Sequence, residues 1–292
     1  MRIRSLGLAL LFGSISLCAS CGDAEAGERP VLRFTVIPDS NNTDMVERLD
    51  PFARHLAERL QMPVEFVPTP DYNASVEAFK NGDVQLAWFG GLTGVQARRA
   101  VPGAQALAQG SLDPHFKSYF VAHKDTGLTK SEDFPMGLKG RRFTFGSADS
   151  TSGRLMPEYF IRQHTGMSPE QFFGRPNSFS NAHDKTAKLV EAGSFEAGAM
   201  NFVQYDQMVR EGKLDPELCR VIWVTPEYVD YQWTVHPKLE DWQEGLTAKL
   251  QKVLLQMDDP AALEAFSRPN GFIAAKNEDY SNLAKVATEL GF

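Results

Sequence analysis

Short apolar strands alternate with amphipathic helices along most of this chain, and this alternation limits its fold more than any other feature. Val31–Ile37 is rich in β-forming residues, Asp50-Pro51 then has the pattern of a helix start, and apolar residues recur at helical spacing from Phe52 to Leu60. Such a rhythm predicts an α/β protein with a largely parallel core sheet. Further strands are expected at Val64–Val67, Val84–Trp88, Arg142–Phe145, Ala197–Met200 and Val221–Val224.

The second half of the chain repeats the strand and helix pattern of the first half, which predicts two α/β lobes. We assign residues 31–120 and 236–292 to lobe 1 and residues 121–235 to lobe 2. The part from Thr247 onward is helical and is expected to pack back on lobe 1.

The first thirty residues have the layout of a secretory leader. Two arginines precede the apolar stretch Leu6–Leu17, which is shorter than the roughly twenty residues that span a bilayer. It ends in Cys18-Ala19-Ser20-Cys21-Gly22, which resembles a bacterial lipobox except that Cys18 replaces the usual aliphatic residue. We therefore expect a signal peptide over 1–20, lipidation of Cys21, a tether over 21–30 and a periplasmic protein anchored to the membrane only by lipid. The alternative is ordinary cleavage near Ala19-Ser20 or near Ala24–Ala26.

Charge and composition exclude several classes of function. The net charge of −7 argues against nucleic acids and anionic lipid surfaces as partners. The six histidines are scattered without metal-ligand spacing and both glycine-rich nucleotide motifs are missing, so no metal and no cofactor is expected. Ser152, His183 and Asp184 or Asp206 could be combined into a triad, but the Gly-x-Ser-x-Gly elbow of a hydrolase is missing. Binding is therefore favoured over catalysis.

A turn rich in hydroxyl groups connects a strand to a helix in the second half. An apolar strand runs into Gly146, four hydroxyl residues follow, and then come Gly153 and a helix with an early proline, Pro157. The first turn of a helix has free N–H groups and a partial positive charge, and glycine lets a ligand approach the backbone. The pattern predicts an anion cradle, and the alternative is an ordinary capped helix. The hydroxyl residues are Ser147, Ser150, Thr151 and Ser152.

Several motifs occur in an order and spacing that resemble one known family. From Val31 to Phe292 the chain is similar to the periplasmic phosphonate-binding family, the substrate-binding subunits of ABC importers for phosphonate, phosphite and related oxyanions. The details of Trp88–Gly94 and Ser150–Pro157 look closest to a branch labelled selenate-binding. The motifs are Asp71-Tyr72, Ala87-Trp88-Phe89-Gly90-Gly91, Phe145-Gly146 through Ser150–Gly153 to Pro157, Asn181-Ala182-His183 and Pro226–Asp230.

The resemblance implies a two-lobed class II periplasmic-binding-protein fold with a hinge, and an ABC permease in the inner membrane as partner of a monomer. Independently of the resemblance, polar and aromatic segments at the strand ends suggest a cleft, and we predict a small ligand flanked by Phe89 or Phe202. The ligand-contacting positions carried over from the family are Tyr72, Ser150, Thr151, Ser152, His183 and Asp230.

Two features of the sequence bear on which ligand is bound. Family members that bind aminophosphonates carry a carboxylate in the stretch aligned with Asn201–Gln204, which has no acid here, so we expect a ligand without a cationic tail. A carboxylate at Asp230 would repel an oxyanion that cannot donate a proton, which favours phosphite, hydrogen phosphate or methylphosphonate monoanion over selenate. A selenate-type carrier and a periplasmic ligand-sensing module remain the alternatives.

Overall fold

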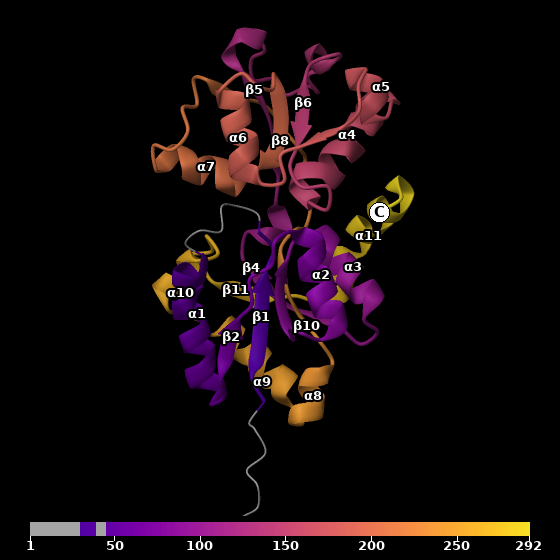
Figure 1. Ribbon diagram of the computed structural model, residues 1–292. Helices are drawn as coiled ribbons and strands as arrows, with labels where there is room; N and C mark the ends of the chain where they lie inside the picture. Colours follow the sequence, from indigo (N-terminus) through magenta and orange to yellow (C-terminus); the bar gives the residue numbers. More distant parts are fainter. Residues whose placement is uncertain (1–29, 39–44) are drawn as a thin grey trace, which may run out of the picture.

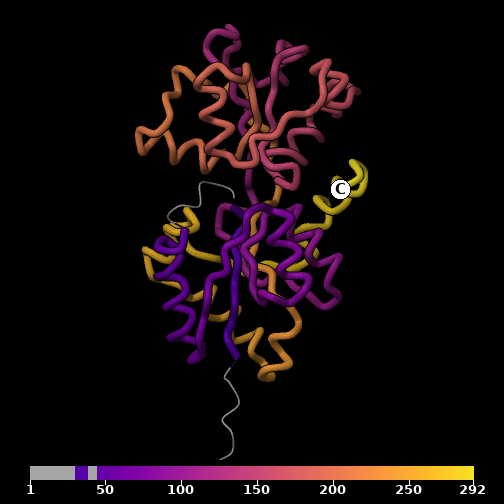
Figure 2. The backbone as a smooth tube through the Cα atoms, viewed as in Figure 1, coloured from indigo at the N-terminus to yellow at the C-terminus, as the bar shows by residue number. Residues whose placement is uncertain are grey.

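The computed structural model describes residues 30–38 and 45–292, and the structural statements below concern these residues. The expected signal peptide, Cys21 and the tether lie outside them. Two α/β lobes lie one above the other and are joined by two crossing segments (Figure 1, Figure 2). This arrangement confirms the predicted α/β, two-lobed fold. No helix in the described part of the chain is long and apolar enough to cross a membrane.

Lobe 1 is built on a six-stranded mixed sheet with the order β11-β4-β10-β3-β1-β2. Strand β1 pairs in parallel with β2 and β3, whereas β10 runs antiparallel between β3 and β4. The strands are β1 (Leu32–Val36), β2 (Val64–Phe66), β3 (Leu86–Phe89), β4 (Gln105–Gly110), β10 (Gln232–Val235) and β11 (Phe272–Ala274), and the helices are α1 (Met45–Leu60), α2 (Tyr72–Asn81), α3 (Gly91–Ala100), α8 (Lys238–Trp242), α9 (Leu246–Leu255), α10 (Pro260–Glu264) and α11 (Ser281–Leu290).

Lobe 2 has a five-stranded sheet with the order β7-β6-β8-β5-β9. Strand β6 pairs in parallel with β7 and β8, and β5 runs antiparallel to β8 and β9. The strands are β5 (Ser118–His123), β6 (Phe143–Phe145), β7 (Ser178–Phe179), β8 (Ala197–Asn201) and β9 (Cys219–Val224), and the helices are α4 (Met156–Thr165), α5 (Pro169–Phe173), α6 (His183–Glu191) and α7 (Phe202–Arg210).

The chain crosses between the lobes after β4 and again after β9. The two crossovers pair with each other, because Phe116 and Tyr228 exchange two backbone hydrogen bonds of 2.9 and 3.0 Å. The boundaries expected at residues 120 and 235 need correction. Strand β5 begins at Ser118 and belongs entirely to lobe 2, and β10 belongs to lobe 1 because it pairs with β3 and β4.

Helix α1 shows how packing can outweigh a local signal. The Asp50-Pro51 pair does not start this helix but lies inside it. The buried stripe that includes Phe52 and Leu56 already begins at Met45, and Phe52 stacks on Trp233 at a ring separation of 4.7 Å. Burial of this apolar face outweighs the missing donor of one proline.

Candidate ligand-binding site

The hydroxyl turn forms the first, π-helical turn (η4, Thr151–Leu155) of a helix that continues as α4. Ser150 is its N-cap, and the Ser150 Oγ accepts a 2.9 Å hydrogen bond from the N–H of Gly153. No hydrogen bond within the described residues takes up the N–H groups of Thr151 and Ser152. First-turn N–H groups of this kind are available to an anion.

Pro157 explains why this turn is held so firmly. Proline has no N–H, so it cannot serve the carbonyl of Ser152 in π-helical register or that of Gly153 in α-helical register. The Ser152 carbonyl instead accepts a 2.7 Å bond from the hydroxyl of Ser118 on β5, and the Gly153 carbonyl accepts a 2.9 Å bond from the N–H of Gly146. The turn is thereby tied to the end of β6 and to the sheet.

Two glycines bring the ring of His183 against this turn. A Cβ atom on Gly153 would lie 3.0 Å from the Cα of Gly146 and 3.1 Å from Cε1 of His183. A Cβ on Gly146 would also lie 3.6 Å from the imidazole. The absence of side chains at both positions therefore lets the imidazole, at the start of α6, pack on the backbone of the cradle.

His183 is a neutral hydrogen-bond donor in this setting. Its Nδ1 accepts a 3.3 Å bond from the backbone N–H of Asn201, so the ring proton lies on Nε2. Burial lowers the pKa of His183 to about 4, which keeps the ring uncharged at neutral pH. The Nε2 atom is buried and has no partner in the described part of the chain.

Asp230 lies on the second crossover and provides the matching acceptor. Its Oδ1 accepts a 2.7 Å bond from the N–H of Gly91 at the start of α3. Its Oδ2 is buried and, like Nε2 of His183, is without a partner among residues 30–38 and 45–292. Burial raises the pKa of Asp230 to about 7, although the bonds from Gly91 and Thr151 oppose that rise.

Thr151 links the two lobes. The N–H of Leu92 on α3 donates a 2.9 Å bond to the Thr151 Oγ1 on η4. A Cβ on Gly90 would lie 3.3 Å from that hydroxyl oxygen and 3.4 Å from Oδ1 of Asp230, so glycine is needed for the three groups to meet. The sequence predicted a ligand contact here, and the structure adds an interlobe contact.

Ser150 and Ser152 of the cradle also have structural roles. Ser150 caps the helix, as described above. Burial raises the pKa of Tyr228 well above its ordinary value, and side-chain hydrogen bonding with Ser118 and Ser152 opposes that rise. The Ser118 hydroxyl lies 2.6 Å from that of Tyr228. The three hydroxyl residues predicted to bind ligand are buried, with exposed fractions of 2% for Ser150, 3% for Thr151 and 1% for Ser152.

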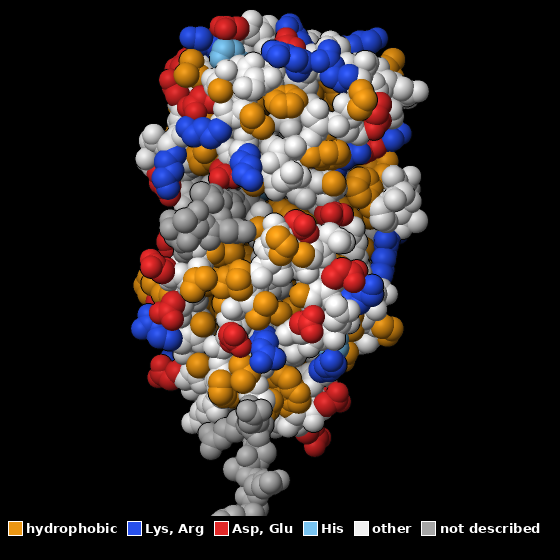
Figure 3. All heavy atoms as spheres, in the orientation of Figure 1, with side chains coloured by type: hydrophobic (Ala, Val, Ile, Leu, Met, Phe, Trp, Pro, Cys, Tyr) orange, Lys and Arg blue, Asp and Glu red, His pale blue; other side chains and the backbone are white. Residues whose placement is uncertain are grey.

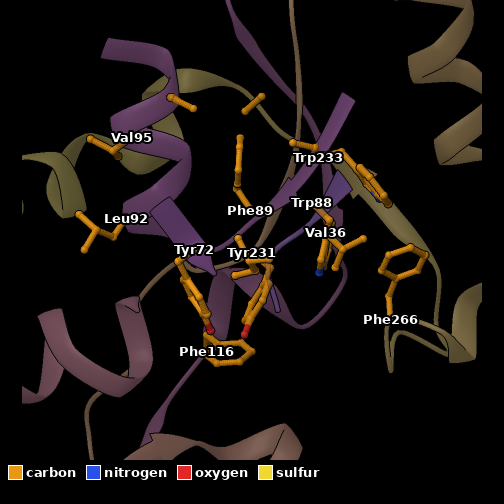
Figure 4. Packing of buried hydrophobic residues seen from close by; sticks show 14 of the residues in the cluster. Val36, Tyr72, Trp88, Phe89, Leu92, Val95, Phe116, Tyr231, Trp233 and Phe266 are labelled. Carbon is orange, nitrogen blue, oxygen red and sulfur yellow. The ribbon is translucent and has the colours of Figure 1, made fainter. Parts of the chain in front are cut away.

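The aromatic side chains differ from expectation at one position. Phe89 packs edge to face on Phe79 at 5.6 Å inside lobe 1 and points away from the tyrosines in Figure 4, so the prediction that it flanks the ligand is wrong. Tyr72, the first residue of α2, and Tyr231 instead direct their hydroxyl groups toward each other (Figure 4). Tyr231, which sequence reasoning missed, accepts a 3.2 Å bond from the Asn201 side chain.

The triad considered from the sequence is not assembled. Nε2 of His183 has no partner within the described ranges, and Nδ1 accepts a backbone N–H instead of donating to a carboxylate. Asp206 accepts a 3.4 Å bond from the hydroxyl of Tyr119. Neither the nucleophile-to-base bond nor the base-to-acid bond of a triad is therefore present.

The charged side chains on the visible surface form no extended field that would attract an anion. Basic and acidic side chains are interspersed on both lobes over the face shown in Figure 3, so that face has no extended basic patch. On this face, capture of an anion would have to rely on local donors such as those of the cradle and not on an extended field.

Comparison with known proteins identifies the family. Residues 34–280 match the model of the ABC transporter phosphonate periplasmic substrate-binding proteins. A probable phosphite-binding protein of an ABC transporter, PhnD1 of Prochlorococcus marinus, is 38% identical over 89% of this chain and 90% of its own length. The phosphonates-binding periplasmic protein of Escherichia coli is 25% identical over 77% of this chain and 65% of its own.

Solved structures agree with this result. PhnD1 of Prochlorococcus marinus, in complex with methylphosphonate, matches with a TM-score of 0.84, covering 89% of this chain and 98% of that chain. A binding-protein component of a phosphonate transporter from Pseudomonas aeruginosa, 20% identical, shares the fold with a TM-score of 0.75 over 89% of this chain and 86% of its own. The chain belongs to the periplasmic substrate-binding proteins of phosphonate ABC transporters.

Proposed function

We propose that this protein captures a small phosphorus oxyanion that carries one proton, and delivers it to its permease. One observation carries the proposal: two buried polar atoms, Nε2 of His183 and Oδ2 of Asp230, have no protein partner in the described chain. One is a donor and the other is an acceptor whenever the carboxyl is ionised. A buried polar atom without a partner is costly, so a ligand that satisfies both is favoured.

The ligand must therefore offer several acceptor oxygens and one donor. The acceptor oxygens fit the Nε2–H of His183 and the first-turn N–H groups of Thr151 and Ser152. The donor, a P–OH group, fits Oδ2 of Asp230. Methylphosphonate monoanion, the hydrogen phosphite monoanion and hydrogen phosphate have this pattern. Hydrogen bonds to charged groups contribute roughly 1.5–3 kcal/mol each, so four or five are compatible with micromolar or tighter binding.

Because the pKa of Asp230 is raised, the proposed preference for phosphorus ligands over selenate depends on pH. At pH 7 this carboxyl is about half protonated, because its pKa is about 7, and the protonated form can itself donate to selenate or sulfate. Above pH 7 each unit makes that form about tenfold rarer. The proposed preference for a protonated phosphorus ligand is therefore small in acid and grows as the pH rises.

The surroundings of Asn201 support a ligand without a cationic tail. Asn201 Oδ1 accepts a 2.6 Å bond from the N–H of Gln204, and its amide nitrogen donates to Tyr231. A chamber between the lobes includes these three residues in its lining. Its charged lining residues within the described chain are two arginines, Arg48 and Arg268. An aminoalkyl group would find no carboxylate there.

The relatives support the same chemistry. One is called a phosphite-binding protein, and its structure holds methylphosphonate. A further relative, 28% identical over 66% of this chain, is called a phosphate-import protein in Mycolicibacterium smegmatis.

Calorimetric titration at pH 8 tests the proposal, with methylphosphonate, phosphite, phosphate, selenate and aminoethylphosphonate as ligands. We expect one or more of the first three to bind in the micromolar range or tighter and selenate to bind about tenfold more weakly, because pH 8 lies one unit above the Asp230 pKa of about 7. Asp230→Asn replaces the acceptor by an amide, so this variant should lose affinity for the phosphorus ligands and lose the discrimination. Tight selenate binding without binding of any phosphorus ligand would refute the proposal.

We also propose that the protein is a carrier without turnover, a monomer, and a lipoprotein anchored at Cys21. Ser152→Ala should lower affinity and reveal no product from any bound ligand. Cys21→Ser should release the protein from the membrane fraction, whereas an unchanged distribution would favour plain cleavage of the leader. Light scattering should give the mass of one chain.

A further inference from the structure

Asp113 and Arg268 form a buried ion pair next to the ligand-facing carboxyl. Asp113 lies on the first crossover, in the short helix η1 (Asp113–His115), and Arg268 follows α10. The guanidinium donates through Nη2 at 2.6 Å to Oδ1 and through Nε at 3.0 Å to Oδ2 of Asp113. The exposed fractions are 0% for Asp113 and 4% for Arg268, so the pair is removed from solvent.

The backbone of Asp113 holds Asp230 directly. The carbonyl of Asp113 accepts a 3.0 Å bond from the N–H of Asp230. The carboxylate of Asp113 also accepts a 2.7 Å bond from the N–H of Gly110 at the end of β4. Through this residue, the position of Asp230 on the second crossover depends on the ion pair and on the sheet of lobe 1.

Arg268 is fixed by more than its acidic partner. Its guanidinium carbon lies 5.6 Å from the ring centre of Trp88, 5.8 Å from that of Phe116 and 5.2 Å from that of Tyr231. Nη1 also donates a 2.8 Å bond to the carbonyl of Phe266. A planar cation that both stacks on rings and binds a carboxylate with two nitrogens cannot be replaced equivalently by lysine.

We propose that the Asp113–Arg268 pair is a positioning device for Asp230, which fixes the second crossover and sets the charge state of the carboxyl that faces the ligand. This inference rests on the proposed role of Asp230 in binding. The carboxylate of Asp113 repels a negative charge on Asp230, and the guanidinium of Arg268 attracts it.

The other ionisable groups of the described chain around this site, which include His183, do not titrate near neutral pH. Burial raises the pKa of Tyr228 on the same crossover and of Tyr280 in η5 (Asn277–Tyr280) well above 10. His183 on α6 is neutral because its pKa is about 4. The contacts from α3 and η4 are the N–H of Gly91 and the hydroxyl of Thr151. Among the described residues, Asp113 and Arg268 are therefore the charged groups that act on Asp230 at neutral pH.

The test is a carbon-13 NMR titration of the aspartate carboxyls in ligand-free protein, with the Asp230 signal assigned from Asp230→Asn. Asp113→Asn removes the repulsion by the Asp113 carboxylate and should lower the midpoint of Asp230 by ~1 pH unit. Arg268→Gln removes the attraction and should raise it by a similar amount. If the ion pair had only a structural role, the Asp230 midpoint would not shift in opposite directions in the two variants. Midpoints that move in the same direction, or not at all, would therefore overturn the proposal.

Two variants that conserve the local charge cover the case in which the single variants fail to fold. Arg268→Lys and the double variant Asp113→Asn/Arg268→Gln should keep the midpoint of the native protein. Both should still bind methylphosphonate at least tenfold more weakly, because the crossover has lost the bonds that fix it. A shifted midpoint, or native affinity in both, would contradict the proposal.

Arg141→Gln is the matched control, since Arg141 pairs with Glu196 at 2.8 Å in lobe 2. It should leave both the midpoint and the affinity unchanged. Because the NMR titration uses no ligand, its outcome is independent of the proposed function. Failure of the native protein to bind methylphosphonate or any other phosphorus ligand would instead count against that function.

Discussion

The two strand-to-helix turns that face each other across the lobes use their N–H groups differently. At the start of α3 in lobe 1, the N–H groups of Gly91 and Leu92 donate to Asp230 and Thr151. At the start of η4 in lobe 2, those of Thr151 and Ser152 have no acceptor within the described residues. The lobe 1 turn thus holds the carboxyl and the opposite lobe, and the N–H groups of the lobe 2 turn are available for the proposed anion.

The largest expected effect is on the free energy of unfolding in acid. A fall in pH from 7 to 4 should lower it through His183 and raise it through Asp230. His183 beside the lobe 2 turn has a folded pKa of about 4, below its unfolded value of about 6.5. Unfolding therefore takes up a proton between these values, and His183 costs stability on the order of 3 kcal/mol as the pH falls from 7 to 4. Asp230 at the lobe 1 turn acts oppositely, because its folded pKa of about 7 lies above the unfolded value.

Urea unfolding at pH 7 and pH 4 measures both contributions. His183→Gln should lose less stability in acid than the native protein, and Asp230→Asn should lose more. If the two variants respond to acid with the same sign, the assignment of a neutral histidine and a raised carboxyl is wrong.

The next largest effect concerns the close approach in the lobe 2 turn. Gly153→Ala places a Cβ 3.0 Å from the Cα of Gly146 and 3.1 Å from the His183 ring, which forces the donors apart. We expect methylphosphonate affinity to fall roughly 100-fold, about 2.7 kcal/mol, as one or two charged hydrogen bonds are lost. Gly137→Ala is the control in the same lobe, because its added Cβ would meet only the flexible side chain of Leu128. Equal affinities for the two variants would argue against the cradle.

The smallest effect concerns the bond between the turns. Thr151→Val keeps the shape but leaves the N–H of Leu92 without its acceptor, which should weaken ligand binding by about 1.4 kcal/mol, or tenfold. Small-angle scattering with ligand should also show a more open average shape. Thr151→Ser retains the hydroxyl and is the control. A valine variant that binds and closes like the serine variant would show that this bond does not matter for closure.

Local sequence predicted the parts of the site that depend on local chemistry. A strand, a glycine and a run of hydroxyl residues predict the turn at Ser150–Gly153, and distant contacts from Ser118 and Leu92 then hold it in place. The resemblance supplied His183 and Asp230, and each is buried with one polar atom that has no partner among the residues that the structure describes. The fold class also followed from the alternation of strands and helices.

The parts that were missed depend on contacts between distant segments. Asp113 and Arg268 are separated by 155 positions, and no local pattern links them. Tyr231 reaches Asn201 only because β10 returns to lobe 1. Phe89 was placed in the cleft because it ends a strand, but side chains alternate along a strand and this one points into the core.

The most direct test of the central claim is the pH dependence of selectivity, measured by calorimetry with methylphosphonate and selenate from pH 6 to pH 9. Selenate must use the proton of Asp230, so above the Asp230 pKa of about 7 its affinity should fall about tenfold per pH unit with uptake of one proton. Methylphosphonate brings its own proton while it is a monoanion, so its advantage should widen between pH 6 and pH 8. A ratio of affinities that does not change with pH, or selenate binding without proton uptake at pH 8, would contradict the assignment of Asp230 as the group that selects a protonated ligand.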